Sequence, residues 1–201
     1  MSNISAIQPG LWRFDGLEQE HKFPVVGYIV QTPDGLILVD PPHAPEAKEE
    51  IEQLGRPYAA VVTGPWHVRG VPLWVQEFGL YVAAPQSARD ELREAGLYPD
   101  MILLDGQEEY GFQVLGLKAG SYDEIAFWHP ESGTLLVGDL LTAREDGQVV
   151  LGPNVYANVP LADLQPIVER LAALQPKLIL SSHLGPREDA QAILDGLTAN
   201  L

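Results

Sequence analysis

Three short apolar runs, each ending in a residue that can take part in chemistry, constrain the fold of this chain more than any other feature. They cover residues 58–63, 134–139 and 178–183. Aliphatic and β-branched runs of this length predict buried strands. Functional side chains gather where the strands of such sheets end, because the loops there vary over a rigid frame. Asp139 and His183, which end the second and third runs, are therefore candidates for a site.

The rest of the chain alternates between predicted strands and helices. Proline and glycine predict a turn at residues 9–10, inside an edge segment, and a hairpin turn at 32–35. Further strands are predicted at 6–14, 25–31, 36–40, 80–83, 101–104, 112–117 and 124–129. Helices are predicted at 45–54, 71–78, 87–95, 161–174 and 187–201. This order indicates two sheets with helices outside. Because no repeat, low-complexity segment or linker divides the chain, one domain over residues 1–201 is expected.

The charge balance restricts the class of partner. The chain has 12 basic and 28 acidic residues and a net charge of −16, whereas nucleic acids and anionic membranes attract a basic face. We therefore expect neither as a partner. The absence of cysteine excludes disulfides and thiolate metal ligands. Since no secretory signal and no apolar stretch of membrane-spanning length is recognisable, a cytoplasmic protein is expected.

The order of the elements and of their end residues resembles the metallo-β-lactamase superfamily. Residues 25–40 are similar to the family's opening hairpin, which ends in an aspartate, here Asp40. Residues 137–140 are similar to the strand end that carries the metal-bridging aspartate, and residues 181–186 to the loop with the last metal histidine. The resemblance covers nearly the whole chain. It implies an α/β (α+β) fold, a four-layer αβ/βα sandwich of two mixed sheets with helices outside.

The family's central metal motif is altered in this chain. The family has Thr-His-x-His-x-Asp-His after a strand, and residues 63–70 here read Thr-Gly-Pro-Trp-His-Val-Arg-Gly. If the loop is two residues shorter, His67 matches the last histidine and Trp66 stands in place of the aspartate. A further family histidine has no counterpart in residues 116–121, where Lys118 is the candidate replacement. The resemblance therefore implies that the dinuclear centre is lost.

His67, Asp139 and His183 can still form a mononuclear metal site. Two divalent ions need about four ligands each, whereas two imidazoles and one carboxylate can hold one ion and leave positions open for water. The resemblance implies that these three positions serve the same ion, expected to be zinc, iron or manganese. His67 and Asp139 are the catalytic candidates, with Asp139 orienting a metal-activated hydroxide.

Other roles remain open for the same residues. His67 and His183 also fit hydrogen-bonding or packing roles, and a buried carboxylate such as Asp139 needs a partner, for which Lys118 or Arg69 would serve instead of a metal. Asp40 is assigned a structural role, because its position favours anchoring loops by hydrogen bonds. The residues assigned to a substrate pocket are Trp66, Arg69, Lys118 and Tyr156. Tyr156 lies in residues 152–160, which match a family loop that often covers the cleft.

Two functions follow from these assignments. The first is a hydrolase-like enzyme with one divalent metal, acting on an ester, thioester or phosphoester. The alternative is a catalytically inactive pseudoenzyme of the same fold, which binds a small ligand or a partner without metal, with Asp139 neutralised by Lys118. Metal-free hydrolysis has little support, since no serine lies in a recognisable nucleophile elbow. A small molecule is the expected partner, and the sequence leaves a homodimer open.

Overall fold

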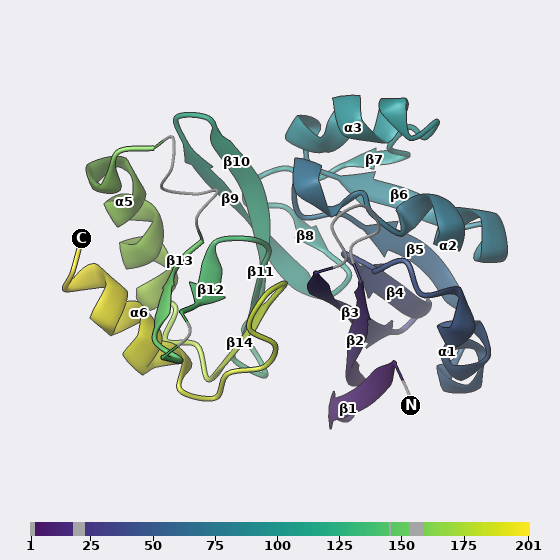
Figure 1. Ribbon diagram of the computed structural model, residues 1–201, viewed down its shortest axis with the longest axis horizontal. Helices are drawn as coiled ribbons and strands as arrows, with labels where there is room; N and C mark the ends of the chain where they lie inside the picture. Colours follow the sequence, from purple (N-terminus) through teal and green to yellow (C-terminus); the bar gives the residue numbers. More distant parts are fainter. Residues whose placement is uncertain (1–2, 18–22, 145, 153–158) are drawn as a thin grey trace. The chain divides into compact units, whose positions relative to one another are not determined.

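The structure is a computed structural model that describes residues 3–17, 23–144, 146–152 and 159–201. The chain forms two compact units, Met1–Leu103 (unit 1) and Leu104–Leu201 (unit 2). Each unit has its own sheet and its own apolar core (Figure 1). The architecture is mixed α/β with two large mixed sheets and helices, so the predicted fold class is confirmed. The prediction of one domain over residues 1–201 stays a prediction.

Unit 1 contains a seven-stranded sheet in the order β1-β2-β3-β4-β5-β6-β7. The strands are β1 (Ile4–Gln8), β2 (Leu11–Leu17), β3 (Pro24–Thr32), β4 (Gly35–Val39), β5 (Pro57–Val61), β6 (Tyr81–Ala84) and β7 (Met101–Ile102). Neighbours from β1 to β4 are antiparallel, and neighbours from β4 to β7 are parallel. Parallel neighbours place their carboxyl ends at the same edge of the sheet, so the residues after β4 and β5 come together there.

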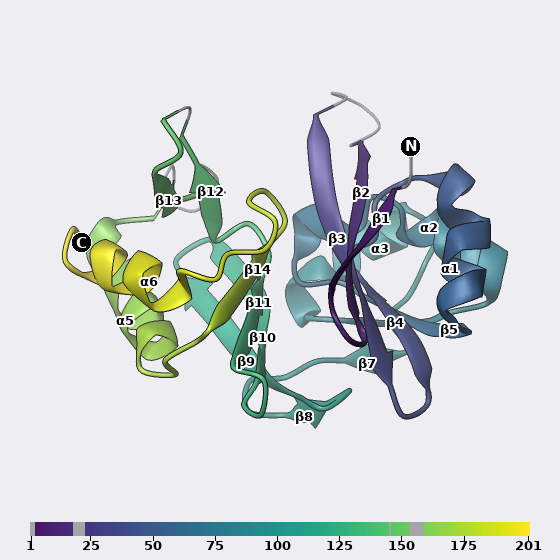
Figure 2. The same cartoon turned by 90° about the horizontal axis from the view of Figure 1, so that it is seen from below.

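Helices cover one face of this sheet in unit 1 (Figure 2). They are α1 (Lys48–Leu54), α2 (Val71–Phe78) and α3 (Arg89–Glu94), preceded by the 3₁₀ turns η1 (Pro45–Ala47), η2 (Pro65–His67) and η3 (Gln86–Ala88). The core between helices and strands includes Phe14, Ile51 and Trp74, all fully buried. Proline at the first position of η1 removes a backbone N–H that has no partner at a helix start, which explains why this helix begins there.

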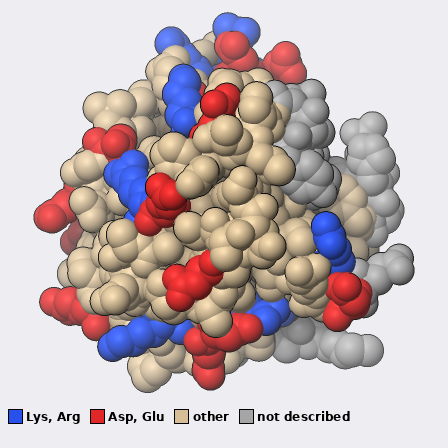
Figure 3. Space-filling model, turned by 90° about the vertical axis from the view of Figure 1, so that its left-hand side faces the viewer, with Lys and Arg blue, Asp and Glu red and all other residues tan. Residues whose placement is uncertain are grey.

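Unit 2 contains a five-stranded sheet in the order β14-β11-β10-β9-β8 and a separate β12–β13 hairpin. The strands are β8 (Glu108–Glu109), β9 (Phe112–Ala119), β10 (Tyr122–His129), β11 (Thr134–Val137), β12 (Leu141–Ala143), β13 (Val149–Leu151) and β14 (Leu178–Ser181). Helices α5 (Leu161–Ala172) and α6 (Ala190–Thr198) pack on one face of the sheet (Figure 2). On the surface of this unit shown in Figure 3, acidic and basic side chains are interspersed.

Most predicted elements are present, and the differences have local causes. The strands of the β12–β13 hairpin were not predicted, and β8 was not predicted because two adjacent glutamates do not resemble a strand. The last helix begins at Ala190 rather than 187, since Arg187 exchanges two backbone hydrogen bonds with Ile179. Within the described residues, no helix combines the length and apolar character that crossing a membrane requires.

Candidate functional site

Asp40 lies directly after β4 and is held in an unusual backbone conformation. Its φ is 46°, a left-handed value that costs free energy in a residue other than glycine. The Asp40 N–H donates to the Val61 carbonyl at 2.9 Å, continuing the parallel ladder past the end of β4. Its Oδ1 accepts the Thr63 N–H at 2.8 Å, and its Oδ2 accepts the Thr63 hydroxyl at 2.6 Å. The buried carboxylate therefore joins the ends of β4 and β5.

The loop after Asp40 is fixed by close contacts with the backbone. The Trp74 indole Nε1 donates to the Pro42 carbonyl at 2.7 Å, and the Gly70 N–H donates to the Pro41 carbonyl at 3.2 Å. A Cβ at Gly70 would collide with the Pro42 carbonyl, and a Cβ at Gly27 would lie 2.6 Å from the Asp40 carbonyl oxygen. Glycine is required at both positions because only a residue without a side chain allows this approach.

His67 ends η2 and is fully buried beside Asp40. Its Nδ1 lies 3.2 Å from Asp40 Oδ2 and 3.0 Å from Arg69 Nη2. The carboxylate can only accept, so a bond to Asp40 requires a proton on Nδ1 and leaves the lone pair on Nε2. The guanidinium can only donate, so a bond from Arg69 requires the opposite tautomer. Asp40 and Arg69 therefore favour different tautomers of His67, and only the first presents Nε2 to a metal.

The residues on either side of His67 in the sequence have different surroundings. The Trp66 side chain is 65% exposed, and its carbonyl accepts the Arg69 Nε–H at 3.2 Å. Arg69 is half-buried and contacts His67, as described above. Their assignment to a substrate pocket stays a prediction.

In unit 2, the register of two parallel strands brings Asp139 and His183 together. Val137 of β11 is aligned with Ser181 of β14, and each site residue lies two positions further along its strand direction. His183 Nε2 lies 2.9 Å from Asp139 Oδ1. The Ser181 hydroxyl, which donates to the Leu141 carbonyl at 2.8 Å, fixes the end of β14. The contact between Asp139 and His183 therefore follows from the parallel register of β11 and β14.

Two residues of β10, Tyr122 and Glu124, complete the Asp139 surroundings and were not predicted. Glu124 Oε2 accepts the Asp139 backbone N–H at 3.1 Å and the Tyr122 hydroxyl at 3.0 Å. A Glu124 carboxylate oxygen and an Asp139 carboxylate oxygen lie within 4.8 Å of one another. Burial raises the pKa of Tyr122 well above its ordinary value, and the neighbouring Glu124 carboxylate raises it further. The available signal was the position of Glu124 directly before the apolar residues 125–128, on the same strand face as Tyr122 two residues earlier.

The predicted pairing of Lys118 with Asp139 is wrong. The Lys118 ammonium donates to Asp123 Oδ2 at 2.6 Å, and its side chain is 71% exposed. These residues are direct cross-strand partners in the β9–β10 pair, and this contact raises the pKa of Lys118. Strand alternation explains the difference, since Lys118 points to solvent while its neighbours Leu117 and Ala119 are buried. Tyr156, also assigned to the pocket, lies outside the described residues.

Each unit thus holds one buried carboxylate beside one imidazole at the ends of two parallel strands. Imidazole nitrogens and carboxylate oxygens are ligands that zinc, iron and manganese accept. The Asp139 carboxylate and the His183 imidazole, which lie 2.9 Å apart, would be available to hold such an ion. The donors present therefore fit a divalent metal.

Comparisons with known proteins agree with this chemistry. A family model described as the metallo-beta-lactamase superfamily matches residues 4–180. The chain is 32% identical over 95 residues to "Probable metallo-hydrolase YqjP" of Bacillus subtilis (strain 168); the match covers 46% of this chain and 29% of that protein. The chain therefore spans less than a third of the length of that relative.

Solved structures show the same fold. The crystal structure of the DIM-1 metallo-beta-lactamase has a TM-score of 0.76 at 14% identity, covering 98% of this chain and 94% of that one. TTHA1623, solved in a di-iron-bound form, has a TM-score of 0.69 at 25% identity, covering 94% of this chain and 100% of that one. The family model matches most of the length of the chain, and the structural neighbours have the same fold. The chain therefore belongs to the metallo-beta-lactamase superfamily.

Proposed function

We propose that this protein is a hydrolase-like enzyme with a single divalent metal ion held by His67, Asp139 and His183. The observation that carries the proposal is the Asp139–His183 pair, in which a buried carboxylate lies 2.9 Å from a partly exposed imidazole. Relatives support it too, since one is named as a metallo-hydrolase and another was solved with two irons.

The surroundings of each donor suit this role. In the tautomer with a proton on Nδ1, His67 donates to Asp40, an arrangement that orients a metal-binding imidazole and raises its basicity. Glu124 holds the Asp139 backbone, which fixes the position from which the Asp139 carboxylate extends. A bound divalent ion would supply a water of lowered pKa and would polarise the bond that is broken. Asp139 would then orient the attacking oxygen, and an ester, thioester or phosphoester is the proposed substrate.

The remaining assignments belong to the same proposal. Trp66 and Arg69 are proposed to contact a small-molecule substrate. The protein is proposed to act in the cytoplasm on small molecules rather than on nucleic acids or membranes, in accordance with its net charge of −16.

Metal content tests the proposal directly. The protein is purified without chelator, equilibrated in turn with zinc, iron(II) and manganese, and analysed by mass spectrometry of the metals. We expect about one ion per chain for the best metal and far less in His183→Ala. His129→Ala is the matched control, because this histidine of the same unit bonds to Ser132 in a turn. A metal content far below one ion per chain, unchanged in His183→Ala, would reject the proposal.

Hydrolysis of a panel of esters, thioesters and phosphoesters separates the enzyme from the inactive alternative. Turnover that requires metal and is lost in Asp139→Asn supports the enzyme. Stoichiometric metal without turnover, or a small ligand bound in the absence of metal, favours a pseudoenzyme whose Asp139 is neutralised by something other than Lys118.

A further inference from the structure

Glu124 lies in one row with Asp139 and His183 across the sheet of unit 2. The row crosses β10, β11 and β14, which are neighbouring strands (Figure 2). The antiparallel register that pairs Phe127 with Leu136, continued past the end of β11, places Glu124 opposite Asp139. The parallel register of β11 and β14 places His183 on the other side of Asp139. Side chains opposite one another on neighbouring strands share a face of the sheet, so three metal-binding groups meet in this row.

The contacts within the row agree with the register. Glu124 Oε2 accepts the Asp139 backbone N–H at 3.1 Å, and Asp139 Oδ1 lies 2.9 Å from His183 Nε2. A carboxylate oxygen of Glu124 and one of Asp139 lie within 4.8 Å of each other. Asp139 therefore has one further donor on each side, and all three donors belong to unit 2.

The Glu124 carboxylate is buried and held in place. The residue is 2% exposed, and the Tyr122 hydroxyl donates to its Oε2 at 3.0 Å. The Asp139 N–H donates to the same oxygen, so two fixed donors orient the carboxylate. A carboxylate has about four acceptor sites on its two oxygens, and two hydrogen bonds leave it able to bind a cation as well.

The charges in this row favour a cation. Glu124 and Asp139 are both buried, and two carboxylates this close repel each other strongly away from water. Burial of such charges is costly unless an opposite charge compensates them. Three cations of the same unit, Lys118, Arg170 and Arg187, pair with other carboxylates at the surface. A divalent ion would balance both buried charges at once.

We propose that Glu124 is a further ligand of the divalent ion, bound together with Asp139 and His183. The inference rests on the proposed function, since it concerns the ion assigned there. Carboxylate oxygen is a ligand that zinc, iron and manganese accept, as imidazole nitrogen is. Glu124 thus supplies a donor that Lys118, whose side chain points to solvent, does not supply. Unit 2 by itself then provides two carboxylates and one imidazole to the ion.

Metal affinity of Glu124→Gln tests the proposal. The glutamine carbonyl oxygen can still accept from Tyr122 and from the Asp139 N–H, so the fold should persist while the charged donor is lost. Isothermal titration calorimetry with zinc and with manganese should give a dissociation constant at least about tenfold higher than in the wild type. Asp123→Asn is the matched control, because it removes the same charge from the adjacent residue, which pairs with Lys118. It should change the constant by less than about twofold, because solvent and salt screen a charge at the surface.

Cobalt(II) distinguishes a ligand from a residue that only orients one. The visible absorption of bound cobalt depends on the number and type of its ligands. At saturating cobalt, Glu124→Gln and Glu124→Ala should change this spectrum. Tyr122→Phe removes a hydrogen bond to Glu124 and keeps the carboxylate, so it should retain the wild-type spectrum.

The possible outcomes separate this inference from the proposed function. Metal binding that is lost in His183→Ala, with affinity and spectrum unchanged in the Glu124 variants, would overturn the inference and leave the proposed function standing. Weaker binding in Glu124→Gln with an unchanged cobalt spectrum would also overturn it. A wild type that binds no metal would reject both. Binding that depends on Glu124 and His183 but persists in His67→Ala would support the inference and remove His67 from the proposed ligands.

Discussion

Each unit has one carboxylate–imidazole pair, Asp40 with His67 in unit 1 and Asp139 with His183 in unit 2, and the two pairs have different roles. In the first, the Asp40 carboxylate accepts two hydrogen bonds from Thr63 in addition to its contact with His67, and its backbone is held at a φ of 46°. In the second, the Asp139 carboxylate lies against His183, whose side chain is 25% exposed. A carboxylate that accepts hydrogen bonds from the end of a neighbouring strand, as Asp40 does, has a structural role, whereas one beside an accessible imidazole is suited to bind a metal.

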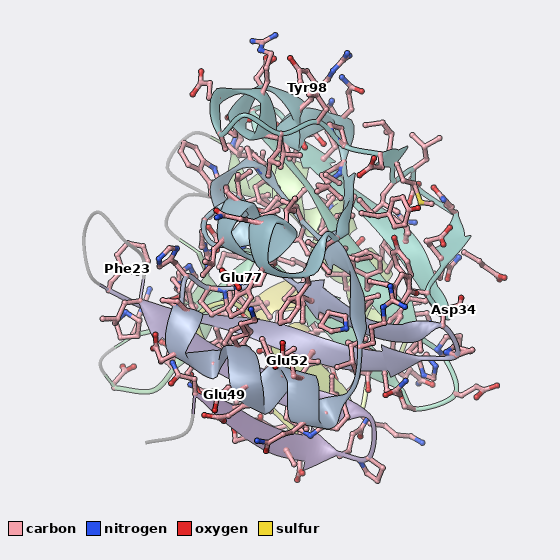
Figure 4. The ribbon with its side chains drawn as sticks, turned by 90° about the vertical axis from the view of Figure 1, so that its right-hand side faces the viewer. Phe23, Asp34, Glu49, Glu52, Glu77 and Tyr98 are labelled. Carbon is pink, nitrogen blue, oxygen red and sulfur yellow. The ribbon has the colours of Figure 1, made fainter. Side chains whose placement is uncertain are left out.

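Removal of the Asp40 carboxylate should produce the largest loss of stability. Asp40→Ala leaves the buried Thr63 N–H and hydroxyl without acceptors and keeps the unfavourable backbone conformation, so the free energy of unfolding should fall by about 3 kcal/mol. Urea unfolding followed by circular dichroism measures this change. Asp34→Ala, at the exposed tip of the β3–β4 hairpin (Figure 4), is the control and should stay within about 0.5 kcal/mol of the wild type. Equal losses in the free energy of unfolding in both variants would contradict the role of Asp40 in holding the ends of β4 and β5 together.

Metal should stabilise the folded protein by binding to the Asp139–His183 pair. A metal present at one hundred times its dissociation constant should raise the free energy of unfolding by about 2.7 kcal/mol. We expect this gain to be lost in His183→Ala, because the variant lacks one of the proposed ligands, and to persist in His129→Ala. Thermal unfolding with and without metal measures it. A gain of equal size in His183→Ala would show that His183 is not a ligand.

The two neighbours of His67 should affect metal affinity in opposite directions. Asp40→Asn removes the carboxylate that favours a proton on Nδ1 and should weaken metal binding about tenfold. Arg69→Ala removes the donor that favours the other tautomer and should strengthen binding, by a smaller factor. Isothermal titration calorimetry with the preferred metal measures both constants. The assignment of tautomers is contradicted if the two variants shift the affinity in the same direction.

Loss of the Tyr122 hydroxyl should have a smaller effect on stability, and this effect should diminish above about pH 10. Tyr122→Phe removes one buried hydrogen bond to Glu124, at a cost of about 1 kcal/mol at neutral pH. Because the folded state raises the pKa of Tyr122, its contribution is fully present below the unfolded pKa of about 10 and is lost as pH rises toward the folded pKa. The wild type should therefore lose stability above about pH 10 more steeply than Tyr122→Phe. Tyr81→Phe, at an exposed position of β6, should show the wild-type pH dependence.

The smallest change in stability is expected for removal of the Lys118 side chain. This variant tests whether Lys118 pairs with Asp139. Lys118→Ala should leave urea unfolding unchanged within error, since its partner is the surface residue Asp123. The double variant with Asp139→Asn should show additive changes in stability, because the two side chains do not pair. An interaction energy between the two substitutions well above the experimental error would indicate that Lys118 and Asp139 pair, against the structure.

The local sequence pattern was sufficient to predict most helices and strands, and three of the strand ends that carry candidate site residues. The apolar runs before Asp40, Asp139 and His183 predict strands, and proline and glycine mark the turns, because these signals depend on neighbouring residues alone. Helix α2 was predicted with its observed bounds. The hairpin β12–β13 and the two-residue β8 were not, since their pairing depends on partners that a local pattern does not reveal.

The sequence by itself determined that carboxylates and imidazoles follow buried strands, because residue types and hydrophobic periodicity are local properties. Only the tertiary structure decided which groups meet. Strand register placed His183 beside Asp139, and the alternation of side chains on β9 and β10 sent Lys118 to solvent while it turned Glu124 and Tyr122 toward Asp139. A one-residue change in register would reverse each of these orientations, which is why residue type and spacing alone could not settle them.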